Sequence, residues 1–235
     1  MKTRVLIPEL MDDSDLDPVE HVRALKGLQR INAWTGNALL AWRPIWKLLH
    51  EIDCRSLRVL DVATGAADIP IGLWRRAAAR GIELEIDACD ISDTALEFAA
   101  RNCVRAKARV RLFRHDILQQ GIPEKYDVVF CSQFLHHLTN EQAAEVLAKM
   151  ASAAMRRVVV VDLVRSQLNW LQVWLATRML SRSRVVHFDG PQSIRAAFTT
   201  TELRALADPC NFGSLTIRTD WPCRLTLTGA LQDHD

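Results

Sequence analysis

Residues 58–68 read RVLDVATGAAD and combine a buried strand, a tight turn and the start of a helix. The run 59–62 is β-branched and apolar except for Asp61, which stands near its C-terminal end. Small residues fill the turn at 63–67, and Asp68 follows at the place of a helix N-cap. In α/β proteins a ligand lies over the carboxyl end of such a strand, so this stretch predicts a nucleotide-type site.

Strand and helix patterns alternate downstream of this turn. We expect strands at 57–62, 83–89, 108–114, 126–131 and 157–162, and helices at 68–79, 92–102 and 140–154. Such alternation indicates a parallel sheet covered by helices on both faces. The chain closes with the alternating runs 213–219 and 224–230, which predict an antiparallel hairpin.

Two helices are expected before the first strand. Residues 1–16 show no sustained period and predict a loosely held segment. A first-turn proline begins a helix over 18–31, and a second helix over 37–51 is bent by Pro44. The two helices form either a cap over the ligand cleft or ordinary outer packing for their tryptophans.

Residues 166–180, SQLNWLQVWLATRML, depart from a plain strand–helix unit. They predict a helix that is apolar on most sides and too short to span a bilayer. We interpret it as a lid over an apolar substrate or as the face of a homodimer. Residues 181–198 are expected to be a loop, and a helix is expected at 200–208.

Composition excludes several classes of protein. The 235 residues fit one α/β domain, and a net charge of +2 gives no argument for a nucleic-acid or membrane surface. The six cysteines lack zinc-site spacing, so no metal is expected, and Cys89 and Cys131 are interpreted as buried strand thiols. The acidic cluster at 12–17 is interpreted as solvated, with metal binding as the lesser alternative. Without a signal peptide pattern or an 18-residue apolar run, we expect a cytoplasmic protein.

The turn after Asp61 resembles the first motif of the class I S-adenosylmethionine (SAM)-dependent methyltransferases, acid-x-Gly-x-Gly-x-Gly. Ala63 and Ala67 replace the outer glycines, and Gly65 keeps the central one. A pyrophosphate needs close backbone approach, whereas SAM offers an ammonium, a carboxylate and adenosine. The resemblance implies that Asp61 meets the ammonium and that free N–H groups of the turn meet the carboxylate.

The resemblance extends to three later places and assigns a set of cofactor-binding residues. An acid at the end of the second strand, Asp90, is expected to accept the ribose hydroxyls, although it could also only cap the next helix. Asp116 is expected near the adenine amino group, with a loop-stabilising role as the alternative. The full expected set is Asp61, Ala63, Thr64, Gly65, Asp68, Asp90, Ile91, Asp116, Ile117, Cys131, Ser132 and Gln133.

Residues 126–138, YDVVFCSQFLHHL, resemble the fourth motif of the family. The His-His-Leu ending is common in the branch of ubiquinone and menaquinone biosynthetic methyltransferases and small-molecule O-methyltransferases. Carbonyls of Cys131 and Ser132, or the amide of Gln133, are expected to face the methionine part of SAM. The run lacks the Asn/Asp-Pro-Pro-aromatic pattern of amino-directed enzymes, which argues against nucleobase methylation.

Three histidines are candidates for removing a proton from the acceptor. A histidine is mostly neutral at working pH and suits a general base. We favour His137, with His136 beside it and His187, oriented by Asp189, as an alternative. Capping or core packing is an equal interpretation for each of the first two, and a plain turn at 189–191 competes with the third.

The resemblance implies a Rossmann-like α/β fold: a seven-stranded sheet, mostly parallel, with a C-terminal antiparallel hairpin and an N-terminal helical cap. We expect one domain over 1–235, divided into a cap at 1–53, a SAM-binding core at 54–165, a lid at 166–198 and a final helix and hairpin at 199–235.

The expected function is SAM-dependent methylation of a hydrophobic or aromatic small molecule of secondary metabolism. Transfer to a hydroxyl oxygen is favoured, with S-adenosylhomocysteine (SAH) as product. Methylation of a ring carbon and a non-catalytic SAM-fold binding module are the alternatives. No nucleic-acid partner is expected.

Overall fold

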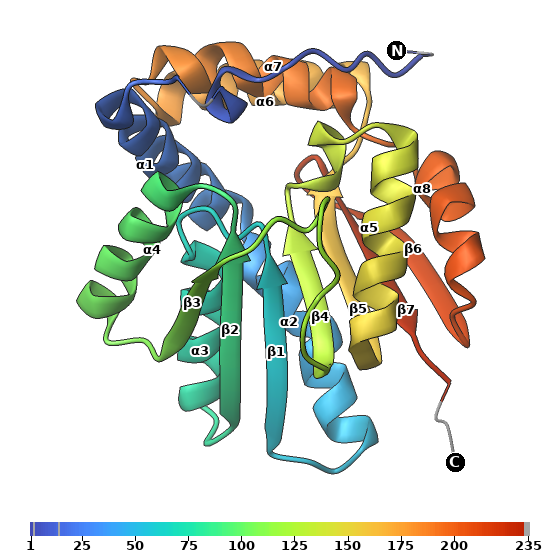
Figure 1. The fold of residues 1–235 in the computed structure, drawn as a ribbon. Coiled ribbons are helices and arrows are strands. Elements are labelled where there is room, and N and C mark those ends of the chain that lie inside the picture. Colours follow the sequence, from blue (N-terminus) through green and yellow to red (C-terminus); the bar gives the residue numbers. More distant parts are fainter. Residues whose placement is uncertain (2, 14, 233–235) are drawn as a thin grey trace.

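A seven-stranded sheet lies at the centre of the computed structural model, which describes residues 1, 3–13 and 15–232 (Figure 1). The strand order is β3-β2-β1-β4-β5-β7-β6; the first five strands in this order are parallel, and β7 is antiparallel to both β5 and β6. The strands are β1 (Ser56–Val62), β2 (Glu83–Asp90), β3 (Val110–Arg114), β4 (Tyr126–Ser132), β5 (Ala154–Leu163), β6 (Ser214–Asp220) and β7 (Arg224–Ala230). The expected sheet and hairpin are therefore confirmed.

Helices cover both faces of the sheet and its carboxyl edge. The helices are α1 (Pro18–Thr35), α2 (Asn37–Glu51), α3 (Asp68–Ala78), α4 (Asp93–Ala106), α5 (Asn140–Ala153), α6 (Gln167–Leu180), α7 (Arg184–Ala196) and α8 (Thr200–Ala207). Apolar side chains of α2 and α3 pack on one face of the sheet, and those of α5 and α8 pack on the other. Helices α1, α6 and α7 lie beyond the strand ends (Figure 1).

The strands in the middle of the sheet end at one level. Val62 on β1 is in register with Cys89 on β2 and with Cys131 on β4. As expected, both thiols are buried within their strands. The residues that follow these positions therefore emerge side by side at the edge over which α1 and α6 lie. Among the described residues, no helix is both long and apolar enough to cross a membrane.

Most of residues 181–198 form a helix, α7 (Arg184–Ala196), rather than the expected loop. Helix α7 begins after Ser183, whose hydroxyl accepts from the N–H of Val186, and it continues through Pro191. Close packing explains the difference: a Cβ placed on Gly190 would lie 2.6 Å from Cγ2 of Thr177 on α6. The pattern Asp-Gly-Pro, typical of a turn, serves here as the close contact between two helices.

The N-terminal segment is anchored, so the expectation of a loosely held start was wrong. The guanidinium of Arg4 donates to the carbonyls of His136 (2.9 Å) and Leu138 (2.5 Å). The N–H groups of Leu10 and Met11 donate to the carboxylate of Asp189 at 2.8 and 3.1 Å. Residues 3–13, here called the N-terminal strap, run along α7 above the sheet (Figure 1).

The turn after β1 is strained at its alanines. Ala63, Gly65 and Ala67 have φ of 57°, 53° and 56°. A left-handed backbone costs an L-residue roughly 1–2 kcal/mol, so the two missing glycines are sites of real strain. Ala67 is the N-cap of α3 and Asp68 its first residue, which corrects the expected capping role of Asp68.

Replacing Ala63 by glycine should raise the free energy of unfolding by about 0.5–1 kcal/mol, because relief of strain exceeds the added freedom of the unfolded chain. Urea denaturation followed by circular dichroism measures the change. The control is Ala66→Gly, at a neighbouring buried position outside the positive-φ set, which should destabilise. Equal destabilisation by both substitutions would contradict the strain.

Candidate active site

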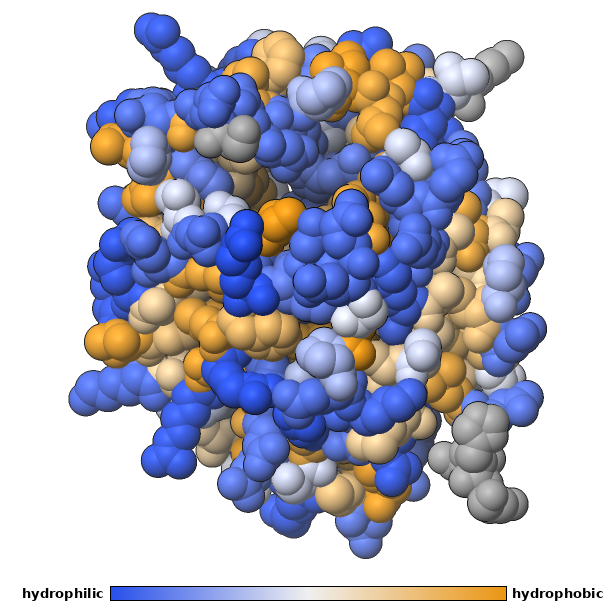
Figure 2. Space-filling view, viewed as in Figure 1, coloured by the Kyte–Doolittle hydropathy of each residue, from blue (hydrophilic) through white to orange (hydrophobic). Residues whose placement is uncertain are grey.

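A large cavity lies over the carboxyl edge of the sheet. Its volume is about 1200 Å³, and its wall comes from the strand ends, α1, α6 and the N-terminal strap. Viewed from the same side as Figure 1, the surface is hollowed below its upper layer, with apolar side chains at the margin (Figure 2). The cavity has two chemically different ends, one at the turn after β1 and one at the two adjacent histidines.

Buried polar atoms without partners gather at the first end. Asp61 is 1% exposed, and its Oδ1 has no hydrogen-bond partner among the described residues. The same holds, within that part of the chain, for the hydroxyls of Thr64 and Ser132, which also line the cavity. Burial raises the pKa of Asp61 well above its usual value, and the nearby carboxylates of Asp68 and Asp90 raise it further. An ammonium group placed here would offset the cost of this buried acid.

The carboxylate of Asp90 joins the end of β2 to the turn. One oxygen accepts from the N–H of Gly65 at 2.8 Å, and the other accepts from the N–H of Ser92 at 3.0 Å. Ser92, rather than Asp90, caps α4 through its side chain. Asp90 and the half-exposed Ile91 both line the cavity.

The predicted adenine residues also lie on the wall. Asp116 and Ile117 line the cavity at the end of β3. Oδ1 of Asp116 accepts from the N–H groups of Leu118 (2.9 Å) and Gln119 (3.3 Å), so the carboxylate also stabilises its own loop.

The end of β4 differs in part from the expectation. Ser132 and Gln133 line the cavity, but Cys131 is 0% exposed and lies in the hydrophobic core. The backbone N–H of Gln133 donates to the carbonyl of Val161 at 2.8 Å. This backbone N–H already has a hydrogen-bond acceptor and is not free to bind a ligand. Gln133 therefore lines the cavity with its side-chain amide.

A chain of side-chain amides on the cavity wall connects an acid, Asp68, to a buried arginine, Arg224. Asn32 donates to Asp68 (3.1 Å), and Gln133 donates to Asn32 (2.5 Å). Arg224, 1% exposed, donates to Gln133 (3.0 Å) and to Asn37 (2.8 Å). Burial lowers the pKa of Arg224 to about 10. Burial raises the pKa of Asp68 to about 6, opposed by the hydrogen bond from Asn32.

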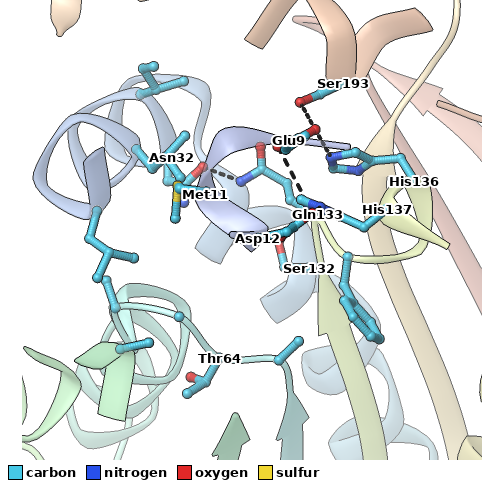
Figure 3. A pocket seen from close by; sticks show the side chains of 18 of the residues that line it. Glu9, Met11, Asp12, Asn32, Thr64, Ser132, Gln133, His136, His137 and Ser193 are labelled. Carbon is cyan, nitrogen blue, oxygen red and sulfur yellow. Dashed lines mark hydrogen bonds and ion pairs between the residues drawn. The ribbon is translucent and has the colours of Figure 1, made fainter. Parts of the chain in front are cut away.

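The second end of the cavity holds His136 and His137, whose rings lie 4.4 Å apart. Nδ1 of His136 is 2.6 Å from Oδ1 of Asp162, and Nδ1 of His137 is 2.7 Å from Oδ2 of Asp12. Nε2 of each ring faces Glu9, at 3.7 Å for His136 and 3.9 Å for His137 (Figure 3). Both histidines thus face the carboxylate of Glu9 through Nε2, and each has a second carboxylate beside its Nδ1.

The charge of His137 differs from the neutral base that the sequence suggested. Burial lowers its pKa, but the carboxylates of Glu9, Asp12 and Asp162 outweigh this effect and raise the pKa to about 9. His137 is therefore protonated near neutral pH when no cation lies beside it. His136 is more deeply placed, at 3% exposure against 21% for the side chain of His137.

The third candidate histidine lies elsewhere. The ring of His187 is 2.8 Å from the carbonyl of Ser181, in the connection between α6 and α7. Asp189 holds the N-terminal strap and does not orient His187. The structure therefore does not pair His187 with Asp189, and His187 is not among the residues that line the cavity.

Four residues of the site escaped the sequence analysis: Glu9, Asp12, Asp162 and Arg224. Asp12 was interpreted as solvated, yet it bonds to His137. Asp162 ends a valine run in β5, and an acid at the end of a buried strand was the signal that could have found it. The other two gave no local signal, because their partners lie more than 90 residues away.

Residues 59–156 match a family model described as a methyltransferase domain. This match covers less than half of the chain, and together with the seven-stranded sheet it supports the class I methyltransferase fold. None of the curated proteins compared matches the chain.

Solved structures agree with this fold. Magnesium protoporphyrin IX methyltransferase of Synechocystis PCC 6803, crystallised with SAH, is 20% identical with a TM-score of 0.59, over 94% of this chain and 90% of that chain. A SAM-dependent methyltransferase of Aquifex aeolicus is 15% identical with a TM-score of 0.62, over 93% and 100% of the chains. Human N-acetylserotonin methyltransferase, in complex with SAM, is 12% identical with a TM-score of 0.66; the match covers 92% of this chain and 56% of that one.

Substitution of Asp189 by alanine should release the N-terminal strap. The change removes two hydrogen bonds to a carboxylate, each of which contributes roughly 1.5–3 kcal/mol. Hydrogen exchange of residues 5–12, followed by mass spectrometry, should then accelerate by about tenfold or more. Asp13→Ala is the control, since within the described part of the chain the carboxylate of Asp13 accepts a local bond from the N–H of Asp15 and none from a distant segment. Unchanged protection in Asp189→Ala would show that other contacts hold the strap.

Proposed function

We propose that the protein transfers the methyl group of SAM to a hydroxyl of an apolar or aromatic small molecule. The observation that carries this proposal is the large cavity with a cofactor-like end and a histidine end. Its volume of about 1200 Å³ exceeds the roughly 300–1,000 Å³ of ordinary small-molecule pockets, which suits two ligands side by side. Family match and fold support the reaction class.

The residues at the first end fit SAM. The unpaired oxygen of Asp61 suits the ammonium group, and the open hydroxyls of Thr64 and Ser132 suit polar atoms of the methionine part. Asp90 would hold the ribose, with Ile91 against the adenine and Asp116 near its amino group. Ala63, Gly65 and Asp68 line the turn that SAM would approach, and the side chain of Gln133 would face its sulfonium side.

The other end supports an apolar acceptor. Met11 on the strap, Leu28 on α1 and Leu175 on α6 are among the apolar side chains of the wall. In this proposal, residues 1–53 and 166–198 act as the cap and lid around the core at 54–165, all within one domain. The homodimer through helix 166–180 stays a prediction; Leu168 and Met179 on this helix are 64% and 82% exposed.

His136 and His137 are the proposed catalytic residues, with His136 as the proposed base because His137 is protonated near neutral pH. Methyl transfer is an in-line displacement at carbon, in which the acceptor oxygen attacks and the sulfur leaves with the bonding electrons. The site must align the three atoms and remove the hydroxyl proton, and alignment alone can supply several kcal/mol. The histidine pair stands on the cavity wall beside the ends of β4 and β5, where an acceptor next to SAM would lie.

Calorimetry with SAM and SAH tests the cofactor assignment. We expect both to bind and Asp90→Asn to weaken binding by about 10- to 100-fold, because a carboxylate that accepts from two hydroxyls is replaced by an amide. Glu97→Gln, on the exposed side of α4, is the matched control and should bind normally. Failure of both ligands to bind at high micromolar concentration would remove the enzyme proposal.

Release of SAH from a panel of apolar phenols tests the acceptor end. His136→Ala should lower turnover by roughly 10²–10⁴-fold and leave the Kd of SAM unchanged. His50→Ala, on α2 beside Trp46, is the control and should keep full turnover. Full turnover in both His136→Ala and His137→Ala would refute the catalytic assignment, and analysis of the product distinguishes oxygen from carbon methylation.

A further inference from the structure

We propose that Glu9, His136 and His137 form a binding site for one divalent transition-metal ion at the acceptor end of the cavity. The metal site rests on the geometry of these three side chains. Its part in catalysis rests in addition on the proposed methyltransferase function.

The three ligand groups converge on one point. The two Nε2 atoms and a carboxylate oxygen of Glu9 all lie within 4.8 Å of one another. Figure 3 shows Glu9 pointing toward both rings. Zinc lies about 2.0–2.2 Å from nitrogen and oxygen ligands, so two of its ligands in tetrahedral geometry are separated by about 3.3–3.6 Å. The contacts of 3.7 Å from His136 to Oε1 of Glu9 and 3.9 Å from His137 to Oε2 are close to that separation. The three ligand atoms together, within 4.8 Å of one another, reach it by an inward movement of at most about 1.5 Å.

The side chains that hydrogen-bond to the three ligand residues also support a metal site. Metal-binding histidines almost always donate their second ring N–H to a carboxylate or carbonyl, which fixes the ring and aims the free nitrogen at the metal. Here both histidines have such a carboxylate on Nδ1, Asp162 for one and Asp12 for the other. The hydroxyl of Ser193 donates to Oε1 of Glu9 at 2.5 Å and orients the third ligand.

The donor set defines the class of ion. Two imidazoles and one carboxylate favour zinc, iron(II), cobalt(II) or manganese(II) over magnesium and calcium, which prefer oxygen ligands alone. Three protein ligands also leave coordination positions open. All three ligand residues line the cavity, so an open position can face a small molecule inside it.

An ion in this place would act on the acceptor hydroxyl. Coordination lowers the pKa of a bound hydroxyl, so its O–H bond breaks and the proton passes to solvent. The oxygen keeps the electron pair and attacks the methyl group of SAM, while the C–S electrons remain on sulfur. No oxidant or reductant is needed. The histidines would then serve the acceptor through the metal rather than by taking its proton themselves.

Metal binding is measured directly on the full-length protein after treatment with a chelator. Titration with cobalt(II), followed by visible absorption, and with zinc, followed by calorimetry, should each give one site per chain. Glu9→Ala and His137→Ala should weaken binding by at least 100-fold, and Asp162→Asn by about 10- to 100-fold. His187→Ala is the control and should bind as the unaltered protein does, because its ring bonds to Ser181.

Three results would overturn the proposal: no stoichiometric binding of either ion at 100-fold molar excess, binding unchanged in Glu9→Ala, or a thiolate charge-transfer band that assigns the cobalt to cysteine. Circular dichroism of each variant confirms that the fold is kept. SAM binding is measured separately on the same metal-free samples. Metal-free protein that binds SAM and methylates phenols at the full rate would remove the metal from catalysis and leave the methyltransferase proposal standing.

Discussion

The common end level of the parallel strands is the constraint on which the site depends. Register places Val62, Cys89 and Cys131 side by side, and Cys131 is paired with Val160 on β5. Each strand therefore delivers its next polar group to the same edge of the sheet. Because this register is set by apolar packing on both faces, the hydrophobic core fixes the positions of the acids at the cavity floor.

The acids at this edge are compensated in different ways, and the differences agree with the roles proposed for them. The carboxylate of Asp90 accepts two backbone N–H groups, and that of Asp162 meets the ring of His136. Asp61 keeps an oxygen without a partner among the described residues. An uncompensated buried acid costs several kcal/mol, so a fold that retains one sacrifices stability at a place where a cationic ligand can restore it. The strained alanines of the adjacent turn add to this cost.

A hydrogen-bonded network between an acid and an arginine also connects segments that are distant in the sequence. Asp68 begins α3 and Arg224 begins β7, and the amides of Asn32 and Gln133 connect them. Each amide can satisfy its neighbours in only one orientation, because an acid stands at one end and a cation at the other. The C-terminal hairpin thereby helps to hold α1 beside the cofactor end of the cavity.

The sequence predicted what local patterns encode. The strand runs and capping signals follow from hydrophobic periodicity and from the residue types at helix ends. The acids at 61 and 90 follow from their positions within an α/β unit, and the structure places both on the cavity wall. Helix α7 was not predicted from the sequence, because its packing against α6 overrides the turn preference of Asp-Gly-Pro. The partners of the histidines escaped for a different reason: Glu9 lies more than 120 residues before His136, so no spacing rule connects them.

The acceptor end of the cavity is complete only when the N-terminal strap is docked. Glu9 and Asp12 both belong to the strap, while the histidines that they meet stand on the core. Asp189 of α7 holds the strap one residue after Glu9 and one residue before Asp12, at Leu10 and Met11. In the proposed function, α7 therefore does more than cover the acceptor, because through the carboxylate of Asp189 it positions the two acids beside the histidine pair. The proposed cofactor end depends on the register of the sheet, whereas the proposed acceptor end depends on this docking.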